Sequence, residues 1–186
     1  MNKIIVGIDE AGRGPLAGPV VAAAVILPYE TEGLADSKKL SAKKREALFE
    51  QIIAIGKVGI GIASIEEIDQ INILQATMLA MQRAYDSLNI QADLVLIDGN
   101  KAPKLNAKEV QWVIDGDNLI PIISAASIIA KVTRDKIMAE LDKEFPKYMW
   151  KNNSGYGTKA HLEAVAKYGI TKHHRLSFAP IKNISK

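Results

Sequence analysis

Residues 3–27 read KIIVGIDEAGRGPLAGPVVAAAVIL and hold two short apolar runs joined by a segment rich in glycine and proline. The first run, residues 3–8, is rich in isoleucine and valine and stops at an acidic pair, which is typical of a buried strand that ends at a functional loop. Residues 20–27 predict a second strand. The glycines and prolines between the runs exclude a regular helix and favour a turn, so we expect the two strands to be antiparallel neighbours.

Further along the chain, helical and strand patterns alternate. Ser41 is a good N-cap, and glycines alternating with valine and isoleucine in residues 58–63 fit a strand that packs closely on one face. The apolar run 94–97 ends in Asp98-Gly99 and is typical of a central parallel strand. These patterns predict layers of helices on a mixed sheet. The expected helices are 41–55, a short one from 64, 73–88 and 124–145, and the further expected strands are 58–63, 94–97 and 110–114.

Length and composition limit the possible classes of protein. A chain of 186 residues with 48% apolar composition is long enough for one well-buried core, so we expect a single domain, residues 1–186. The absence of cysteine excludes disulfides and thiolate metal sites and suits a cytoplasmic protein. The longest apolar run, residues 20–27, is too short to span a bilayer, which needs roughly 20 residues, and the N-terminus lacks a cleavage site for secretion. We therefore expect no membrane segment, and a monomer by default.

The charge distribution favours a polyanionic partner only weakly. The net charge is +3, from 24 basic and 21 acidic residues, which alone does not justify a nucleic-acid partner. Basic residues gather at Lys38, Lys39 and 43–45, and the tail from 159 to 186 holds one acid, Glu163. Such clusters can follow phosphates, although a solvated helix face is their commoner explanation.

Carboxylates at the ends of buried strands are the most informative feature. Asp9 and Glu10 follow the first strand and Asp98 closes the central one, so two elements bring acids to one sheet edge. Gathered carboxylates repel one another and raise each other's pKa unless a cation neutralises them. With no cysteine and with three histidines late in the chain, such a site favours Mg²⁺ or Mn²⁺ over Zn²⁺ and points to phosphoryl transfer. Any one of these acids, taken alone, is also typical of a cap or turn.

Residues 8–20, IDEAGRGPLAGPV, strongly resemble the opening motif of the ribonuclease HII family. The likeness continues in the family's order through DSKKLS, IDG, SAASIIAKVTRD, GYGTK and HRLSF, which begin at residues 36, 97, 124, 155 and 174. It covers almost the whole chain. The resemblance implies a ribonuclease H-like α/β fold, with a five-stranded mixed sheet flanked by helices, and a metal site and catalytic centre made of four carboxylates: Asp9, Glu10, Asp98 and Asp117.

The fourth carboxylate has competitors. Asp117 matches the family by its distance before the Ser-Ala-Ala-Ser helix, but the local pattern, DGDNLIP from residue 115, departs from the usual bacterial form. Asp115 lies close enough to compete for the role. Asp135 is a third acid of the right type, and we interpret it as a structural residue of the helix.

Three segments are candidates for contact with the substrate. In Gly12-Arg13-Gly14 the glycines leave the backbone bare, so that it can approach a ribose and bind the 2′-hydroxyl, and the family uses this segment in that way. The resemblance places a substrate-sensing tyrosine at Tyr156, beside the junction between ribonucleotide and deoxyribonucleotide. Lys38 is a candidate phosphate contact.

The implied activity is hydrolysis of the RNA strand of RNA–DNA hybrids and incision 5′ to single ribonucleotides embedded in duplex DNA. Water activated by Mg²⁺ or Mn²⁺ would attack, leaving a 3′-hydroxyl and a 5′-phosphate. Two alternatives stand beside it. A non-catalytic nucleic-acid binding module would not need acids beside its anionic ligand. A dinucleotide-binding enzyme fits Gly12-x-Gly14-x-x-Ala17 loosely, but that fingerprint must open a helix, which the following prolines oppose.

Overall fold

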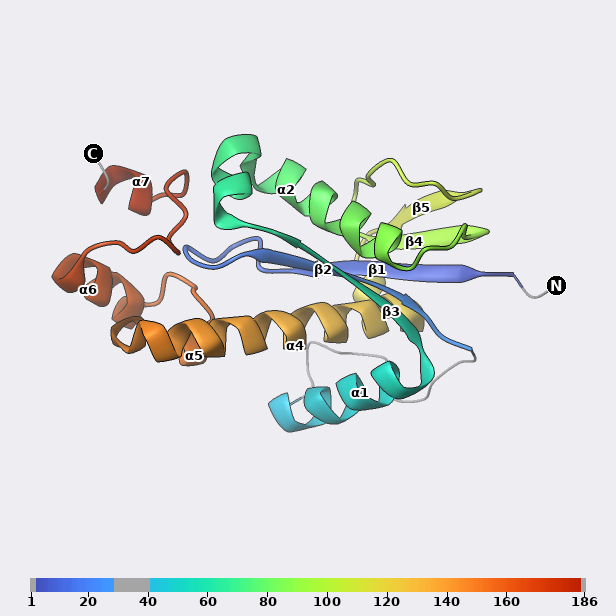
Figure 1. Cartoon of the computed structure of the whole chain (residues 1–186), viewed down its shortest axis with the longest axis horizontal. Helices are drawn as coiled ribbons and strands as arrows, with labels where there is room; N and C mark the ends of the chain where they lie inside the picture. The colour runs from blue at the N-terminus through green and yellow to red at the C-terminus, as the bar shows by residue number, and fades with distance from the viewer. Residues whose placement is uncertain (1–2, 29–40, 185–186) are drawn as a thin grey trace.

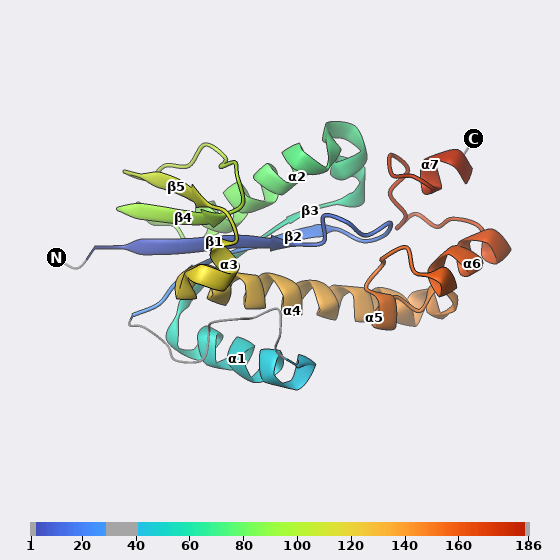
Figure 2. The same cartoon turned by 180° about the vertical axis from the view of Figure 1, so that it is seen from behind.

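The computed structural model describes residues 3–28 and 41–184 and shows a mixed five-stranded sheet with helices on both faces. The strand order is β3-β2-β1-β4-β5. Helix α2 covers one face, and α4 with α1 beneath it covers the other (Figure 1; Figure 2 shows the same layers from behind). The strands are β1 (Ile5–Ala11), β2 (Val20–Ile26), β3 (Lys57–Ala63), β4 (Leu94–Asp98) and β5 (Val110–Val113). The helices are α1 (Ala42–Ile55), α2 (Ile65–Ser87), α3 (Gly116–Leu119), α4 (Pro121–Glu144), η2 (Pro146–Tyr148), α5 (Trp150–Asn153), α6 (Lys159–Tyr168) and α7 (Ile181–Ile184).

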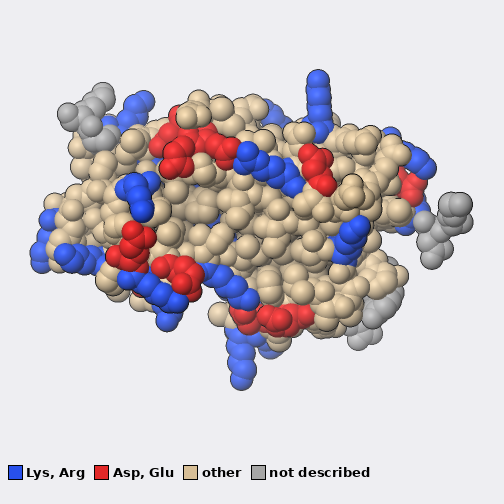
Figure 3. All heavy atoms as spheres, viewed as in Figure 1, with Lys and Arg blue, Asp and Glu red and all other residues tan. Residues whose placement is uncertain are grey.

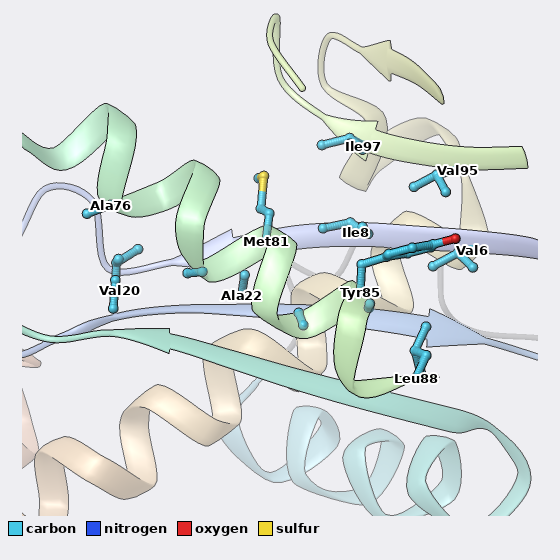
Figure 4. Close-up of a cluster of buried hydrophobic side chains, with 14 of the residues drawn as sticks. Val6, Ile8, Val20, Ala22, Ala76, Met81, Tyr85, Leu88, Val95 and Ile97 are labelled. Atoms are coloured by element: carbon cyan, nitrogen blue, oxygen red, sulfur yellow. The ribbon is translucent and has the colours of Figure 1, made fainter. Parts of the chain in front are cut away.

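The central strand β1 pairs antiparallel with β2, as the sequence predicts, and parallel with β4. Its side chains alternate between the two faces. Val6 and Ile8 join the buried cluster under α2, where Figure 4 shows them near Met81 and Tyr85. Gly7 faces α4, because a Cβ there would lie 2.2 Å from the carbonyl oxygen of Ile122. The same alternation points Asp9, the next odd-numbered residue of β1, toward the start of α4.

Strand β3 packs closely on one face, also as predicted. A Cβ on Gly59 or Gly61 would lie 2.1 or 2.0 Å from the carbonyl oxygens of Ala84 and Ala80 in α2. The isoleucine between these glycines points away from α2 and is 39% exposed. The missing side chains therefore let α2 lie directly on the sheet.

The C-terminal third of the described chain forms a third buried cluster at the end of the molecule away from the N-terminus (Figure 1). Its apolar side chains come from the end of α4, from η2, α5, α6 and α7, and from the connection between β1 and β2. The connection is thus held between the sheet and the C-terminal helices. No helix in the described part of the chain is both long and apolar enough to cross a membrane.

Two helix boundaries differ from the prediction. The helices expected from residue 64 and at 73–88 are one helix, α2, with a kink at Asn72, whose φ is 69°. Asparagine tolerates this conformation, and its side chain accepts hydrogen bonds from the backbone N–H groups of Leu74 and Gln75. Helix α4 begins at Pro121 rather than at Ser124, since proline is favoured in the first turn. The predicted caps at Ser41 and at Ser64 are confirmed.

The close contact between β3 and α2 predicts a large penalty for one added methyl group. Gly61→Ala should destabilise the protein by about 1–3 kcal/mol, because the Cβ overlaps a helix carbonyl that cannot move freely. Ile60→Thr on the other face of the same strand is the matched control and should stay within about 0.5 kcal/mol of the unchanged protein. Urea unfolding measures both, and equal stability of the two variants would contradict the packing described here.

Candidate active site

An open cavity of about 430 Å³ lies where the ends of β1 and β4 meet α3 and α4. Four acids from three elements line it, and four basic side chains and the Gly12–Gly14 segment complete most of the wall. The acids are Asp9, Glu10, Asp98 and Asp117, and the basic residues are Arg13, Arg45, Lys131 and Arg134. The structure therefore brings together the acids that the sequence predicts.

Asp9 is 4% exposed and faces α4, following the alternation that begins at Gly7. One of its carboxylate oxygens accepts a hydrogen bond from the backbone N–H of Glu10 at 2.7 Å. Burial raises the pKa of Asp9 well above its usual value, and the charges of Glu10 and Asp98 raise it further. A hydrogen bond from the side chain of Ser127 in α4 acts in the opposite direction. The strand therefore presents a carboxylate whose charge is poorly solvated.

Glu10 lies at the mouth of the same cavity, with a side chain that is 11% exposed. Burial raises its pKa, and the nearby Arg13 guanidinium, 3.3 Å from Oε1, opposes that rise. The other carboxylate oxygen, Oε2, is buried and has no hydrogen-bond partner among the described residues. Glu10 thus offers one oxygen to a cation from outside the chain.

Asp98 and Asp117 come close to each other through a glycine. The backbone N–H of Asp117 donates to Oδ1 of Asp98 at 3.3 Å. A Cβ on Gly116 would lie 2.7 Å from Cδ1 of Ile123 and 3.2 Å from Cβ of Val113, so glycine lets α3 lie here without displacing these side chains. Asp117 is 1% exposed, and its carbonyl oxygen accepts a hydrogen bond from the Ser124 hydroxyl at 2.5 Å.

The two competing acids lie elsewhere. Asp115 is exposed, has a left-handed backbone at the start of α3 and does not line the cavity. Asp135 forms an ion pair with Lys131 at 2.6 Å and accepts a hydrogen bond from Ser154, which fits the structural role expected for it. By position, Asp117 is the acid that accompanies Asp9, Glu10 and Asp98.

Two buried arginines hold the glycine-rich connection from behind. Arg175 donates to the backbone carbonyls of residues 12, 13, 18 and 19, and Arg134 donates to those of residues 17, 19 and 154. Burial lowers the pKa of Arg134 to about 10 and that of Arg175 to about 9. We did not anticipate either from the sequence. Arg134 lies four residues from both Ala130 and Met138 on the buried stripe of α4, which is a usable signal of burial. For Arg175 the only signal is its place in the HRLSF motif, which gives no reason for burial.

Tyr156 borders the cavity beside Gly14. Its side chain is 48% exposed, and a Cβ on Gly14 would lie 3.4 Å from the ring atom Cε1. The predicted contact segments Gly12–Gly14 and Tyr156 therefore adjoin each other. Lys38 lies outside the described residues. On the face shown in Figure 3, basic and acidic side chains are interspersed.

The chemistry of this set fits a hard divalent cation, because all four candidate donors are carboxylates and two have raised pKa values. Nevertheless, the described part of the chain contains no group of three or more Asp, Glu or His side chains arranged closely enough to hold a metal ion. The four acids line the same cavity, but their side chains do not converge on one point closely enough to hold an ion.

The chain is similar to known proteins over nearly its whole length. The family model described as Ribonuclease HII matches residues 6–181. A ribonuclease HII of Coxiella burnetii (strain Dugway 5J108-111) is 56% identical over 186 residues, covering 98% of this chain and 92% of that protein. One from Wolbachia sp. subsp. Brugia malayi (strain TRS) is 52% identical over 189 residues, covering 100% and 93%. The crystal structure of ribonuclease H2 from Pyrococcus horikoshii OT3 superposes with a TM-score of 0.80 at 28% identity, covering 97% of this chain and 96% of that one.

The raised pKa values predict how charge removal affects stability. Ionised Asp9 and Glu10 are unfavourable in the folded, metal-free protein, so stability is highest below their unfolded pKa values near ~4 and falls as pH rises through the folded ones. Asp9→Asn should therefore raise the Tm at pH 7 in the presence of chelator, and this advantage should vanish near pH 4. For a chain of this length, each ~1 kcal/mol of relieved repulsion gives about 2–4 °C.

Asp115→Asn is the matched control, since that carboxylate is exposed. Its Tm should follow that of the unchanged protein at both pH values. Addition of Mg²⁺ at pH 7 should stabilise the unchanged protein more than Asp9→Asn. A Tm for Asp9→Asn that equals or falls below that of the unchanged protein at pH 7 would show that Asp9 is not under electrostatic strain.

Proposed function

The chain belongs to the ribonuclease HII family and is an endoribonuclease, and on that premise we propose that it cuts RNA strands paired with DNA and cuts duplex DNA on the 5′ side of single embedded ribonucleotides. The products would be a 3′-hydroxyl and a 5′-phosphate. Asp9, Glu10, Asp98 and Asp117 would form the catalytic centre. A single domain spanning residues 1–186, acting as a monomer, would be sufficient.

One observation carries this proposal: four carboxylates from β1, β4 and α3 line a single cavity next to a bare Gly-Arg-Gly backbone. A protein that only bound nucleic acid would be weakened by these acids, because each repels phosphate. Their presence in the same cavity as Arg13, Arg45 and Lys131 fits a site that neutralises its own acids with a cation and holds the phosphates with its basic side chains.

The metal ion would be Mg²⁺ or Mn²⁺, held by Asp9, Glu10, Asp98 and Asp117. When bound, such a cation supplies Lewis-acid polarisation of the phosphate and lowers the pKa of water at the site. The protein's part is to deliver buried acids from three rigid elements. Glu10 has a buried oxygen with no hydrogen-bond partner in the part of the chain that the structure describes. Release of its other oxygen from Arg13 would free that guanidinium for a phosphate.

Recognition of the ribose would come from the backbone of Gly12-Arg13-Gly14. The carbonyls of Gly12 and Arg13 are already held by Arg175, so their positions are set before the substrate arrives. The N–H and C=O groups of this segment can distinguish a 2′-hydroxyl, which donates and accepts hydrogen bonds, from the hydrogen of deoxyribose. The exposed ring of Tyr156 beside Gly14 would stack on the adjoining sugar or base.

Cleavage of an end-labelled DNA duplex containing one ribonucleotide tests this function. We expect cutting on the 5′ side of the ribose in Mg²⁺ or Mn²⁺, and none in chelator. An all-DNA duplex of the same sequence is the control and should remain intact. Cutting on the 3′ side, or equal cutting in chelator, would contradict the proposal.

The position of Asp117 predicts a difference between two neighbouring acids. Asp117→Asn should lower the cleavage rate on the order of 100-fold or more, since loss of a metal ligand removes several kcal/mol of transition-state stabilisation. Asp115→Asn should remain within about twofold of the unchanged enzyme, because its side chain is exposed outside the cavity. Single-turnover rates on the same duplex measure both. The reverse order would assign the fourth ligand to Asp115.

A further inference from the structure

A buried chain of ring hydrogen bonds lies behind Tyr156 and is not used by the proposed chemistry. Nε1 of Trp150 lies 3.0 Å from Nε2 of His161, and Nε2 of His174 lies 3.2 Å from the same atom. Nδ1 of His161 lies 2.9 Å from the backbone carbonyl oxygen of Tyr156. All three rings are fully or almost fully buried. This series of hydrogen bonds thus connects the third buried cluster to the backbone of Tyr156, which borders the cavity.

The partners determine the tautomer of each histidine. The indole N–H of Trp150 can only donate, so Nε2 of His161 must accept and its proton must reside on Nδ1, facing the Tyr156 carbonyl. The backbone N–H of Thr171 donates to Nδ1 of His174 at 2.9 Å, so the proton of that ring resides on Nε2. His174 therefore donates to His161. These two deductions are independent and agree with each other.

We propose that His161 is a positioning residue for substrate discrimination: held in its Nδ1–H tautomer by Trp150 and His174, it fixes the backbone of Tyr156 and thereby the ring that contacts the substrate. This inference rests on the proposed role of Tyr156. The Tyr156 carbonyl accepts one further hydrogen bond, from the backbone N–H of Thr158 at 2.8 Å. His161 adds a second link between this loop and the buried cluster, beside the hydrogen bond from the backbone N–H of Leu16 to the Gly155 carbonyl at 2.8 Å.

The surroundings keep both rings neutral. Burial lowers the pKa of His161, and burial together with the neighbouring His161 lowers the pKa of His174 to about 4. The groups that face them are aromatic or polar: Tyr148 packs edge-on against both rings, Trp150 packs edge-on against both, and Thr171 caps His174. A second proton on His161 would reside on Nε2, where it would point at the N–H groups of Trp150 and His174. The donor on Nδ1 is therefore constant throughout the neutral pH range.

Two substitutions separate positioning from packing. The amide of asparagine reaches the place of Nδ1, and that of the longer glutamine reaches the place of Nε2. His161→Asn keeps a donor for the Tyr156 carbonyl but leaves Trp150 and His174 without an acceptor. His161→Gln keeps that acceptor and loses the donor to Tyr156. His161→Asn should therefore lose stability and keep activity, whereas His161→Gln should keep more of its stability and lose activity.

The experiment measures urea unfolding together with kcat/KM on two substrates, a duplex with one embedded ribonucleotide and a continuous RNA–DNA hybrid. We expect His161→Asn to unfold at lower urea yet to keep the ratio of the two kcat/KM values within about twofold. We expect His161→Gln to unfold nearer to the unchanged enzyme yet to lose on the order of tenfold on the embedded ribonucleotide, the size of one stacking contact. Activity that follows stability in both variants would overturn the proposal.

Tyr156→Ala separates this inference from the proposed function. If Tyr156→Ala discriminates like the unchanged enzyme, the role assigned to the ring is wrong, whereas a defect in Tyr156→Ala without one in His161→Gln rejects the positioning role alone. Long-range ¹H–¹⁵N spectra of the unchanged protein give a readout independent of activity. They should show His161 protonated on Nδ1 and His174 on Nε2, and a proton on Nε2 of His161 would overturn the inference.

Discussion

Like-charge repulsion inside one cavity is the constraint on which the arrangement of this protein depends. Asp9 and Asp117 are almost fully buried, and Glu10 and Asp98 share their cavity. Ionised carboxylates in such a place oppose folding unless a cation joins them. The surrounding packing has to compensate for that cost. Apolar side chains are buried on both faces of the sheet, and glycines let α2 and α4 approach the sheet closely.

The opposite wall of the cavity is stabilised in a different way. Arg134 and Arg175 are buried, and seven hydrogen bonds to backbone carbonyls of the connection and of Ser154 surround their guanidinium groups. These bonds satisfy the buried charges within the chain and fix the backbone that we propose reads the ribose. The acids, in contrast, are the groups for which we propose a cation from outside the chain. A backbone segment held by hydrogen bonds within the chain therefore adjoins the four carboxylates that we propose bind a cation.

Much of this arrangement was predictable from local sequence. The apolar runs around the first acidic pair predicted the hairpin, and strand-end acids predicted that Asp9, Glu10 and Asp98 would share one edge of the sheet. The family resemblance added Asp117 and the five-stranded sheet. The roles of these four acids as metal ligands stay predictions. What local pattern could not give depends on contacts between distant segments. Six of the seven hydrogen bonds from the two arginines to carbonyls join residues more than 100 positions apart. The hydrogen-bonded histidines come together only after α5 and α6 have packed.

The most direct test of the account is an anomalous difference map from crystals of the Asp98→Asn variant, soaked in Mn²⁺ with a bound duplex that contains one ribonucleotide. We expect this substitution to slow cleavage while leaving three acids in place. The account predicts anomalous density among Asp9, Glu10 and Asp117, within coordination distance of the phosphate on the 5′ side of the ribose. Mn²⁺ bound away from these acids, with the same phosphate seated elsewhere on the protein, would contradict it.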